Sequence, residues 1–351
     1  MVLREPDTFH SYLAHFEGHQ DCGFLSPQLY SPSYHTADND GKSISPCSNR
    51  ASLLEAMSGG GRHGFEEPFT PKGCRYRWYT TEEICMILDR FDGVVFIGDD
   101  MLRHIYAAFN ILLRENVALG GLEQWKMTDI ERDSCRCDHQ FVKPECSNFL
   151  VSSSEEVTKH GSEGAHRSPF YCQRTPHFFL QISGSPAPET LHTTLADLLA
   201  KDHDSYKPVP MIHSIGLSTA LEWLSATKSM DEWLAIADKS LRNTPFLWVG
   251  PAAAGHLKPP AQIMGQGNNA LWHYTIQTAK EAGSRGLEVL GMYNMTLQAA
   301  SWDGSHYGEK VALVQAMTVS YQHLSVYPHY ASRTLTILRQ IINWLSRLES
   351  S

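Results

Sequence analysis

Two short segments, far apart in the chain, carry residues that could act together in acid–base chemistry. Asp100 and Arg103 closely follow the apolar run 94–97. Asp303 and His306 lie three positions apart near the end of the chain. At that spacing a carboxylate can orient an imidazole ring so that its second nitrogen faces a cleft. We therefore predict one shared site, whose catalytic groups are Asp100, Arg103, Asp303 and His306.

The elements that must position these residues follow an α/β pattern. Strands are predicted at 94–97, 177–182, 209–215, 246–249 and 287–290. Helices are predicted at 81–88, 101–114, 190–200, 217–227, 231–242, 268–282, 309–323 and 334–348. This alternation predicts a mainly parallel sheet with helices on both faces. Ligands bind at the carboxyl ends of such strands, where Asp100 is expected to lie.

Two parts of the chain lack this periodicity. Residues 1–75 are rich in Ser, Gly, Pro and Asp, which predicts an irregular covering held by cysteines. The α/β domain is expected to span 76–351, with a loop-rich insertion at about 125–175. Asp99, at the turn after the first strand of that domain, is expected to hold the turn by accepting backbone N–H bonds.

The cysteines are confined to the first half of the chain, at 22, 47, 74, 85, 135, 137, 146 and 172. An even set in loop-rich parts favours a disulfide framework made in an oxidising compartment. Reduced structural thiols remain open, as does a zinc site around Cys135, Cys137 and His139. Asn294 begins a glycosylation sequon, which is compatible with a secreted glycoprotein. The first residues lack the apolar core of a signal peptide, so secretion would imply that a leader has been trimmed.

Composition narrows the range of partners. The chain has 351 residues, of which 42% are apolar and 19% charged, and its formal net charge is −9. This balance argues against a nucleic acid or an anionic membrane surface as the main partner. No apolar run is long enough to span a membrane. No convincing metal cluster is found among the histidines, so neither a metal nor a cofactor is expected. The oligomeric state is left open.

The segments around 98 and 303 resemble a known family, the fungal SGNH hydrolases of the PC-esterase type, which are related to polysaccharide O-acetylation proteins. The family's first block, GDSxxR, corresponds to GDDMLR at 98–103, and its last block, DxxH, to DGSH at 303–306. A middle block similar to GLWN reads GLST at 216–219, and the lead-in GCRYRW at 73–78 is also similar. The resemblance spans about 70–325 and implies an SGNH-like three-layer sandwich.

Two departures from the family pattern bear on the chemistry. Asp100 stands where the family has its serine nucleophile, and Thr219 stands where it has an oxyanion-hole asparagine. Attack by a carboxylate would form a mixed anhydride, and His306 would have no hydroxyl proton to remove. A missing oxyanion donor costs ~3 kcal/mol of transition-state stabilisation. Routine ester hydrolysis is therefore not expected.

We predict instead a non-hydrolytic biosynthetic enzyme. The chain is similar to fungal SGNH-like proteins of tropolone–sesquiterpenoid pathways, which act as intermolecular hetero-Diels–Alderases. That resemblance implies a reaction that joins an ortho-quinone methide, of tropolone or polyketide type, to a humulene-type sesquiterpene. It implies small apolar or aromatic substrates, held by Gly216, Thr219, Trp272, His273, Trp302 and Tyr307. The aromatic members of this set are also typical of core residues.

Two other functions remain open. One is a carbohydrate O-acyl esterase or acetyltransferase of the PC-esterase type, and the other is a non-catalytic pseudo-esterase, in which Asp100 is a relic. A deep apolar cleft around Asp100 would favour the cycloaddition, and an open polar groove would favour the esterase.

Overall fold

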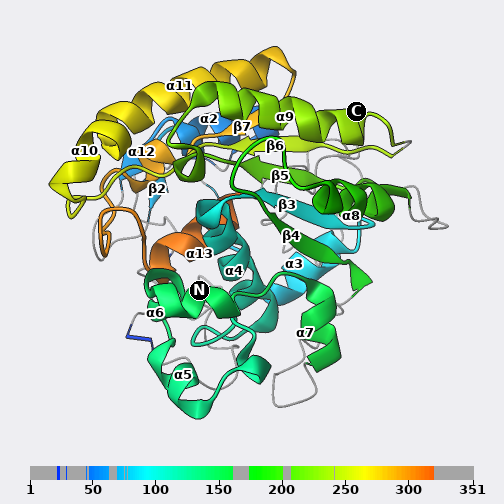
Figure 1. Ribbon diagram of the computed structural model, residues 1–351, viewed down its shortest axis with the longest axis vertical. Helices are drawn as coiled ribbons and strands as arrows, with labels where there is room; N and C mark the ends of the chain where they lie inside the picture. Colours follow the sequence, from blue (N-terminus) through cyan, green and yellow to red (C-terminus); the bar gives the residue numbers. More distant parts are fainter. Residues whose placement is uncertain are drawn as a thin grey trace, which may run out of the picture.

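Five strands form one sheet, in which every neighbouring pair runs parallel, in the order β4-β3-β5-β6-β7 (Figure 1). They are β3 (Val94–Gly98), β4 (His177–Gln181), β5 (Met211–Ser214), β6 (Phe246–Val249) and β7 (Glu288–Leu290). The computed structural model describes residues 47–62, 69–74, 76, 78–160, 174–200, 207–240 and 242–319, together with residues 22, 23, 29 and 45. All five predicted strands are confirmed, whereas the predicted helix at 334–348 lies outside the described residues.

Both faces of the central strands are buried, as their continuous apolar sequences predict. Every residue of β3 is buried, and its side chains alternate between two separate cores. Phe96 packs in one core with Ile212, whereas Val95 and Ile97 pack in the other. This alternation follows from the two-residue period of a strand.

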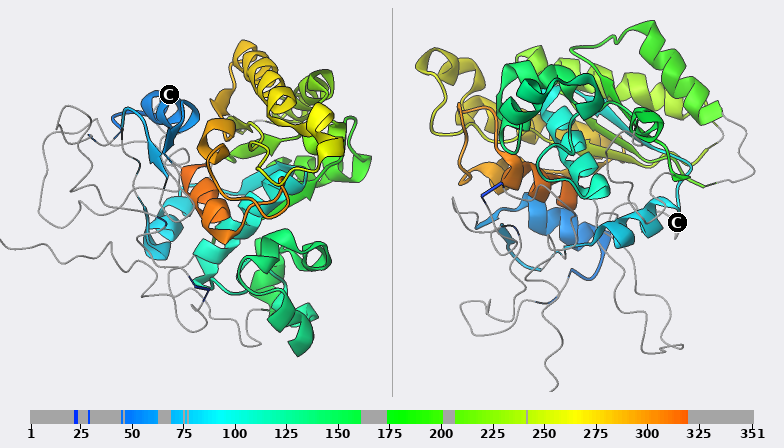
Figure 2. Two further views of the ribbon diagram at one scale, coloured as in Figure 1. Left: turned by 90° about the vertical axis from the view of Figure 1, so that its left-hand side faces the viewer. Right: turned by 90° about the horizontal axis from the view of Figure 1, so that it is seen from below.

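Helices cover the two faces of the sheet and complete a three-layer sandwich (Figures 1 and 2). The first core contains side chains from α2 (Arg50–Ser58), α3 (Thr81–Leu88), α4 (Asp100–Arg114) and α13 (Glu309–Thr318). The second contains side chains from α8 (Glu189–Ala200), α9 (Trp223–Ala237) and α11 (Asn268–Ser284). The predicted α/β fold class is therefore confirmed.

The strand order places a change of direction at the carboxyl ends of β3 and β5. The chain leaves β3 into α4 on the first face, and it leaves β5 towards α9 on the other. Because β3 and β5 are neighbours, the two connections diverge from adjacent strand ends, which makes this position a topological switch point. Open α/β sheets bind ligands at such a switch point.

The remaining elements are short. The helices are α5 (Asp129–Ser134), α6 (His139–Val142), α7 (Ser154–His160), α10 (Pro260–Gln266) and α12 (Tyr293–Thr296). Three-residue or six-residue 3₁₀ turns occur at Gln124–Lys126, Pro144–Phe149 and Leu217–Thr219, and β1 (Gly61–Arg62) pairs with β2 (Thr70–Pro71).

Several helices occupy sequence that lacks a predicted helix, and one helix runs across two predicted ones. The predicted helices at 217–227 and 231–242 were wrong as separate elements, because one continuous helix, α9, begins at Trp223 and ends at Ala237. Asn49 caps α2 through a reciprocal pair of hydrogen bonds with Ser52, a signal that the irregular composition around it obscured. Thr128 caps α5 in the same way within the loop-rich insertion.

Disulfides occur in the loop-rich parts, as predicted, and one of the described pairs joins the N-terminal part to the insertion. The described pairs are Cys22–Cys137, Cys47–Cys74 and Cys135–Cys146, and Cys85 is also disulfide-bonded. The zinc alternative was wrong, because Cys135 and Cys137 each use their sulfur in a different disulfide. Disulfides of this kind are typical of an oxidising compartment.

Two further sequence signals can be placed in the fold. The sequon residue Asn294 is half-buried on α12, and its side-chain amide donates a hydrogen bond to the Ser58 carbonyl at 2.8 Å. The side-chain amide to which a glycan would be attached is thus hydrogen-bonded to the backbone of α2. Within the described parts of the chain, no helix combines the length and apolar character that a membrane span requires.

Candidate active site

Asp99 links the end of β3 to the end of β5, where the two connections diverge. It is the N-cap of α4, and its Oδ1 accepts the Met101 N–H at 3.3 Å. Its Oδ2 accepts the N–H groups of Gly216 at 2.9 Å and of Ser218 at 3.4 Å. Burial raises the pKa of Asp99, and these hydrogen bonds oppose the rise. The structural role predicted for Asp99 is confirmed, and it extends from the turn after β3 to the turn after β5.

Gly98 allows β3 and β5 to approach this closely. A Cβ atom at residue 98 would lie 2.4 Å from the Ser214 carbonyl oxygen and 2.8 Å from a Leu102 methyl carbon. Real Cβ atoms do not make such contacts, so a larger residue would push the strand ends apart. The glycine of the GDD segment is therefore a packing requirement.

Asp100 is exposed at the start of α4, at the carboxyl end of β3, as expected. Its Oδ1 accepts a hydrogen bond from the Gln181 side-chain amide at 2.6 Å. Gln181 is the last residue of β4 and pairs with Gly98 in the sheet register. The helix N-terminus favours a negative charge at this position. Sequence reasoning missed Gln181, because only the pairing of β3 with β4 brings it here.

Arg103 lies one turn further along α4. Its Nη2 donates a hydrogen bond to the Leu150 carbonyl at 3.4 Å, and its buried Nε has no hydrogen-bond partner. Burial lowers the pKa of Arg103, while the charges of Asp100 and Glu123 raise it. Within the described residues, Arg103 makes no hydrogen bond to Asp100, so its influence on that carboxylate is electrostatic.

Asp303 and His306 form the hydrogen-bonded pair that their spacing predicts. His306 Nδ1 lies 2.6 Å from Asp303 Oδ2. The other oxygen, Oδ1, accepts the backbone N–H groups of Ser305 at 2.8 Å and His306 at 2.7 Å. Burial raises the pKa of Asp303, but these hydrogen bonds and the His306 charge outweigh it, and the pKa lies below its usual value. The carboxylate therefore fixes both the ring and the turn that carries it.

His104 connects the two segments, and sequence reasoning missed it. Its ring centroid lies 5.5 Å from that of His306 and 5.7 Å from that of Phe141. Burial lowers the pKa of His104 to about 3, and the charges of His306 and Arg103 contribute to this shift. The ring is therefore neutral at physiological pH. The available signal was its position one helical turn after Asp100, which places both residues on one face of α4.

The residues predicted to bind substrate are dispersed. Thr219 Oγ1 donates a hydrogen bond to the Gly216 carbonyl at 3.0 Å, within the turn after β5. Trp272 is 40% exposed on α11, beside Tyr293, and its neighbour His273 is also exposed.

The last two predicted contacts flank the Asp303–His306 pair. Trp302 is 51% exposed and lies edge-on to His139. Tyr307 is buried, and its hydroxyl donates a hydrogen bond to the Ala253 carbonyl at 2.5 Å. Tyr307 thus occupies a small core cluster with Ala252, which is the alternative that its aromatic character left open.

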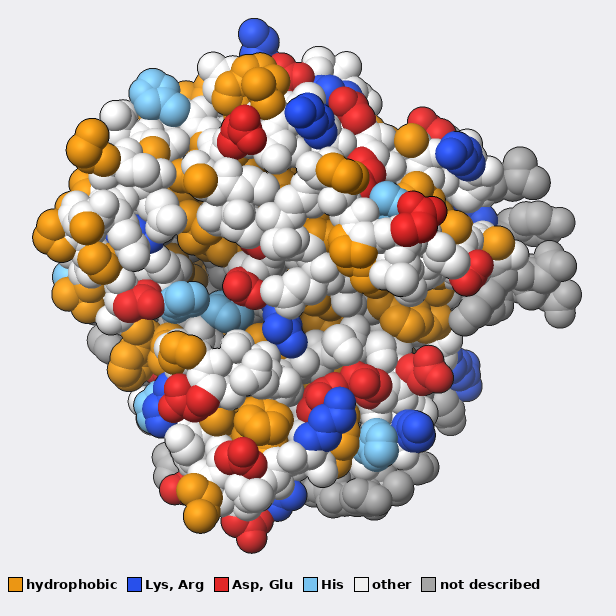
Figure 3. All heavy atoms as spheres, in the orientation of Figure 1, with side chains coloured by type: hydrophobic (Ala, Val, Ile, Leu, Met, Phe, Trp, Pro, Cys, Tyr) orange, Lys and Arg blue, Asp and Glu red, His pale blue; other side chains and the backbone are white. Residues whose placement is uncertain are grey.

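The candidate site is open and polar. Asp100 and Asp303 are exposed, and the His306 side chain is 42% exposed. Figure 3 shows a shallow hollow across this face of the molecule, along which histidine, acidic and basic side chains gather. A cavity of about 210 Å³ lies instead at the amino-terminal edge of the sheet, where its lining includes Phe91 and Pro176.

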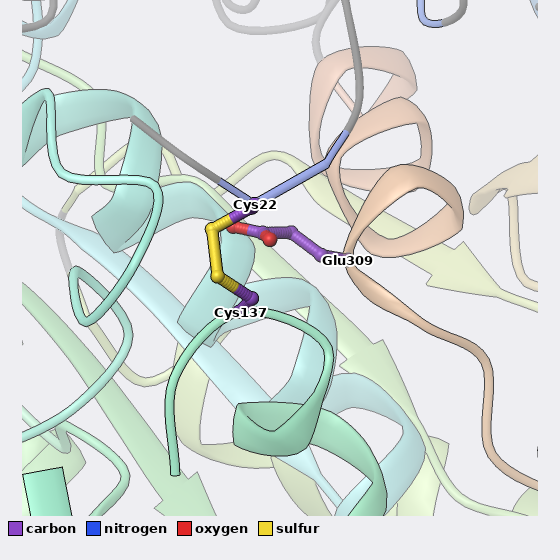
Figure 4. A group of neighbouring side chains, drawn as sticks. All are labelled: Cys22, Cys137 and Glu309. Atoms are coloured by element: carbon purple, nitrogen blue, oxygen red, sulfur yellow. A yellow bond between two sulfur atoms is a disulfide. The ribbon is translucent and has the colours of Figure 1, made fainter. Parts of the chain in front are cut away.

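One group of side chains has the spacing of metal ligands. Cys22, Cys137 and Glu309 place their ligand atoms within 4.8 Å of one another (Figure 4). The two sulfurs are joined in a disulfide, so neither offers a thiolate to a metal. Both carboxyl oxygens of Glu309 are buried without a hydrogen-bond partner. Burial, together with the nearby Asp138 charge, raises the pKa of Glu309 well above its usual value.

Comparison with solved structures finds similarity in fold alone. The fold is similar to that of a carbohydrate acetylesterase from Sinorhizobium meliloti, with a TM-score of 0.35 and 13% sequence identity. The match covers 64% of this chain and 94% of that chain. No protein-family model matches the chain, and no curated protein matches it. The assignment of the fold accordingly depends on the strand order and the two covered faces of the sheet.

Proposed function

We propose that the chain is a non-hydrolytic SGNH-like enzyme, which orients and polarises its substrates at Asp100 without becoming acylated there. The observation that carries the proposal is the hydrogen bond from Gln181 to Asp100 at the carboxyl end of β3. Where the resemblance expects a serine hydroxyl, the chain presents a carboxylate held by an amide. Such a pair can accept a proton or position a polar group, but it provides no hydroxyl nucleophile.

The reaction that we propose is the hetero-Diels–Alder addition of an ortho-quinone methide to a humulene-type sesquiterpene. A cycloaddition forms its bonds without a covalent enzyme intermediate, so orientation and a polarising group are sufficient. The His306–Asp303 pair supplies a base for the loss of water that generates the quinone methide. The exposed rings of Trp302 and Trp272 offer apolar surface to the terpene. A secreted protein with disulfides is consistent with this role.

The proposal is tested with a quinone-methide precursor and the terpene, in the presence and absence of the full chain. Product yield and enantiomeric excess are measured by chiral chromatography. We expect faster formation of one stereoisomer, and a loss of ~10²–10⁴-fold for Asp100→Ala if the carboxylate acts in acid–base catalysis. Asp100→Asn keeps the shape of the side chain but removes its charge. It therefore shows whether the loss in Asp100→Ala comes from the missing charge or from altered packing. Racemic product at the uncatalysed rate with the unmodified protein would overturn the proposal.

The open and polar surroundings of Asp100 and His306 favour a second candidate function, that of a carbohydrate O-acyl esterase. An exposed hydrophilic face suits a sugar better than a terpene. Hydrolysis of an aryl acetate tests this candidate directly. Robust hydrolysis that Asp100→Ala abolishes would replace the cycloaddition with an aspartate-based hydrolase, and no hydrolysis above background would remove the candidate.

A further inference from the structure

A lysine and a serine lie in direct contact beside the Asp303–His306 pair. Lys258 Nζ donates a hydrogen bond to Ser305 Oγ at 2.5 Å and another to Gln266 Oε1 at 2.9 Å. Lys258 is only 7% exposed, whereas Ser305 is half-buried and reachable from solvent. A nearly buried amine touching an accessible hydroxyl is the arrangement found in serine–lysine nucleophiles.

Backbone contacts hold the two side chains together. The turn that carries Lys258 is closed by a hydrogen bond from its N–H to the Gly255 carbonyl at 3.1 Å. The Gly255 N–H in turn donates to the Gly304 carbonyl at 3.1 Å. Gly304 has a φ of +83°, and a Cβ atom at this residue would lie 2.1 Å from the backbone nitrogen of Lys258. Two backbone segments in such close contact fix the pair without relying on the flexibility of the lysine side chain.

We propose that Ser305 and Lys258 form a nucleophilic pair that attacks esters with an apolar acyl or aryl group. In the reaction, Ser305 Oγ bonds to the acyl carbon and the hydroxyl proton passes to the neutral amine of Lys258. The alcohol leaves with that proton, and water later hydrolyses the acyl-serine. The exposed side chains of Leu257 and Trp302 lie near the pair in sequence and supply apolar contact for the acyl group.

The surroundings of Lys258 make its ammonium easier to deprotonate than that of an exposed lysine. Burial lowers the pKa of Lys258, and the Asp303 charge opposes the shift. The Asp303 carboxylate is already engaged by the His306 ring and by two backbone N–H groups, so it makes no direct salt bridge with Lys258 among the described residues. The ammonium therefore has two neutral hydrogen-bond acceptors and no contacting carboxylate.

This inference adds an ester-hydrolysing activity at Ser305 to a protein whose site at Asp100 we propose to be non-hydrolytic, and it does not depend on that proposal. The cycloaddition uses the carboxylate of Asp100, whereas the covalent step uses a hydroxyl in the turn before α13. The two can be measured separately, because the covalent step increases the mass of a serine-containing peptide and the cycloaddition does not change the mass of the protein.

The test uses the full chain and an alkyl phosphonofluoridate. Attack by Ser305 forms a phosphorus–oxygen bond, breaks the phosphorus–fluorine bond and releases fluoride, while the proton passes to Lys258. Peptide mass spectrometry then locates the label. We expect one phosphonate per chain, on Ser305. Absence of label on the folded protein, or label on another residue, would overturn the proposal.

Variants show whether Lys258 acts as a general base or only holds Ser305 in place. Lys258→Arg keeps the positive charge and the donors but cannot accept the proton at neutral pH. We expect it to label at least ~10²-fold more slowly, because general bases contribute ~10²–10⁴-fold. Ser305→Ala should not label, and Ser284→Ala, at an exposed serine of α11, should label normally. Labelling of Lys258→Arg at the unmodified rate, with its circular dichroism unchanged, would refute the role of the lysine.

Discussion

Asp99 accepts the backbone N–H of Gly216 at 2.9 Å and thereby joins the ends of two neighbouring strands that lead to opposite faces of the sheet. The connections after these strands diverge, and this carboxyl group holds the two strand ends together. The same group caps α4. One buried side chain thus sets the geometry of the candidate site.

Replacement of Asp99 by alanine should destabilise the protein, whereas the same change at Asp100 should not. Asp99→Ala leaves the buried N–H group of Gly216 without its acceptor, which costs ~1–3 kcal/mol, and it also removes the acceptor of the N–H group of the exposed Ser218. Asp100 is exposed and has one side-chain partner, Gln181. Urea unfolding of both variants measures the difference. Equal free energies of unfolding would show that the bridge contributes nothing.

His104 should remain neutral while the folded protein is acidified. Its pKa in the folded state is about 3, and an unfolded histidine binds a proton below about pH 6.5. Between these values the unfolded state binds the extra proton, so stability is lost as the pH falls, by up to ~1.4 kcal/mol per pH unit. His177 and His213 add to this loss, because burial lowers the pKa of each to about 3 and about 4.

NMR titration measures this directly. The ring resonances of His104 should not move between pH 8 and pH 5 in the folded protein, and they should titrate near pH 6.5 in urea. An inflection near pH 6.5 in the folded protein would contradict the buried, neutral ring.

Glu309 should make the protein less stable as the pH rises. Its folded-state pKa is raised well above the usual value of 4.5, so the folded carboxyl group stays protonated where the unfolded one ionises. The contribution of Glu309 to the free energy of unfolding is therefore greatest below about pH 4.5. As the pH rises above this value the contribution falls by up to ~1.4 kcal/mol per pH unit, until the pH reaches the folded-state pKa.

Glu309→Gln keeps the shape of the neutral side chain and removes the titration. The variant should gain stability relative to the unmodified protein as the pH rises from 4 to 8, with the smallest difference at pH 4. Denaturant unfolding at a series of pH values provides the measurement. A difference independent of pH would mean that Glu309 ionises normally in the folded state.

The sequence predicted those features that depend on local patterns. Continuous apolar runs predicted the strands, and the aspartate after Gly98 predicted a capped turn, because both depend on neighbours along the chain. The spacing of Asp303 and His306 likewise predicted their hydrogen bond. The apolar pattern could not show that one helix runs through 228–230, nor that Leu217–Thr219 form a separate 3₁₀ turn, since that turn is held by Asp99 from the end of β3.

The rest of the site depends on contacts between distant segments. Gln181 reaches Asp100 only because β4 pairs with β3 in one register, and His104 meets His306 only because the turn before α13 lies over α4. Lys258 and Ser305 are separated by 47 residues and meet through the close approach of Gly255 to Gly304. No local pattern marks such residues, because the same side chains on the surface would look identical in the sequence.

The adjacent positions of Asp99 and Asp100 differ in their tolerance of substitution. The inward-facing residue maintains the architecture of the strand ends, while its outward-facing neighbour has a single side-chain partner and is exposed to solvent. A substitution at residue 100 should therefore leave the scaffold stable. Other small polar residues are compatible with this exposed position, whereas residue 99 is held to its place by its roles as helix cap and as bridge between two strand ends.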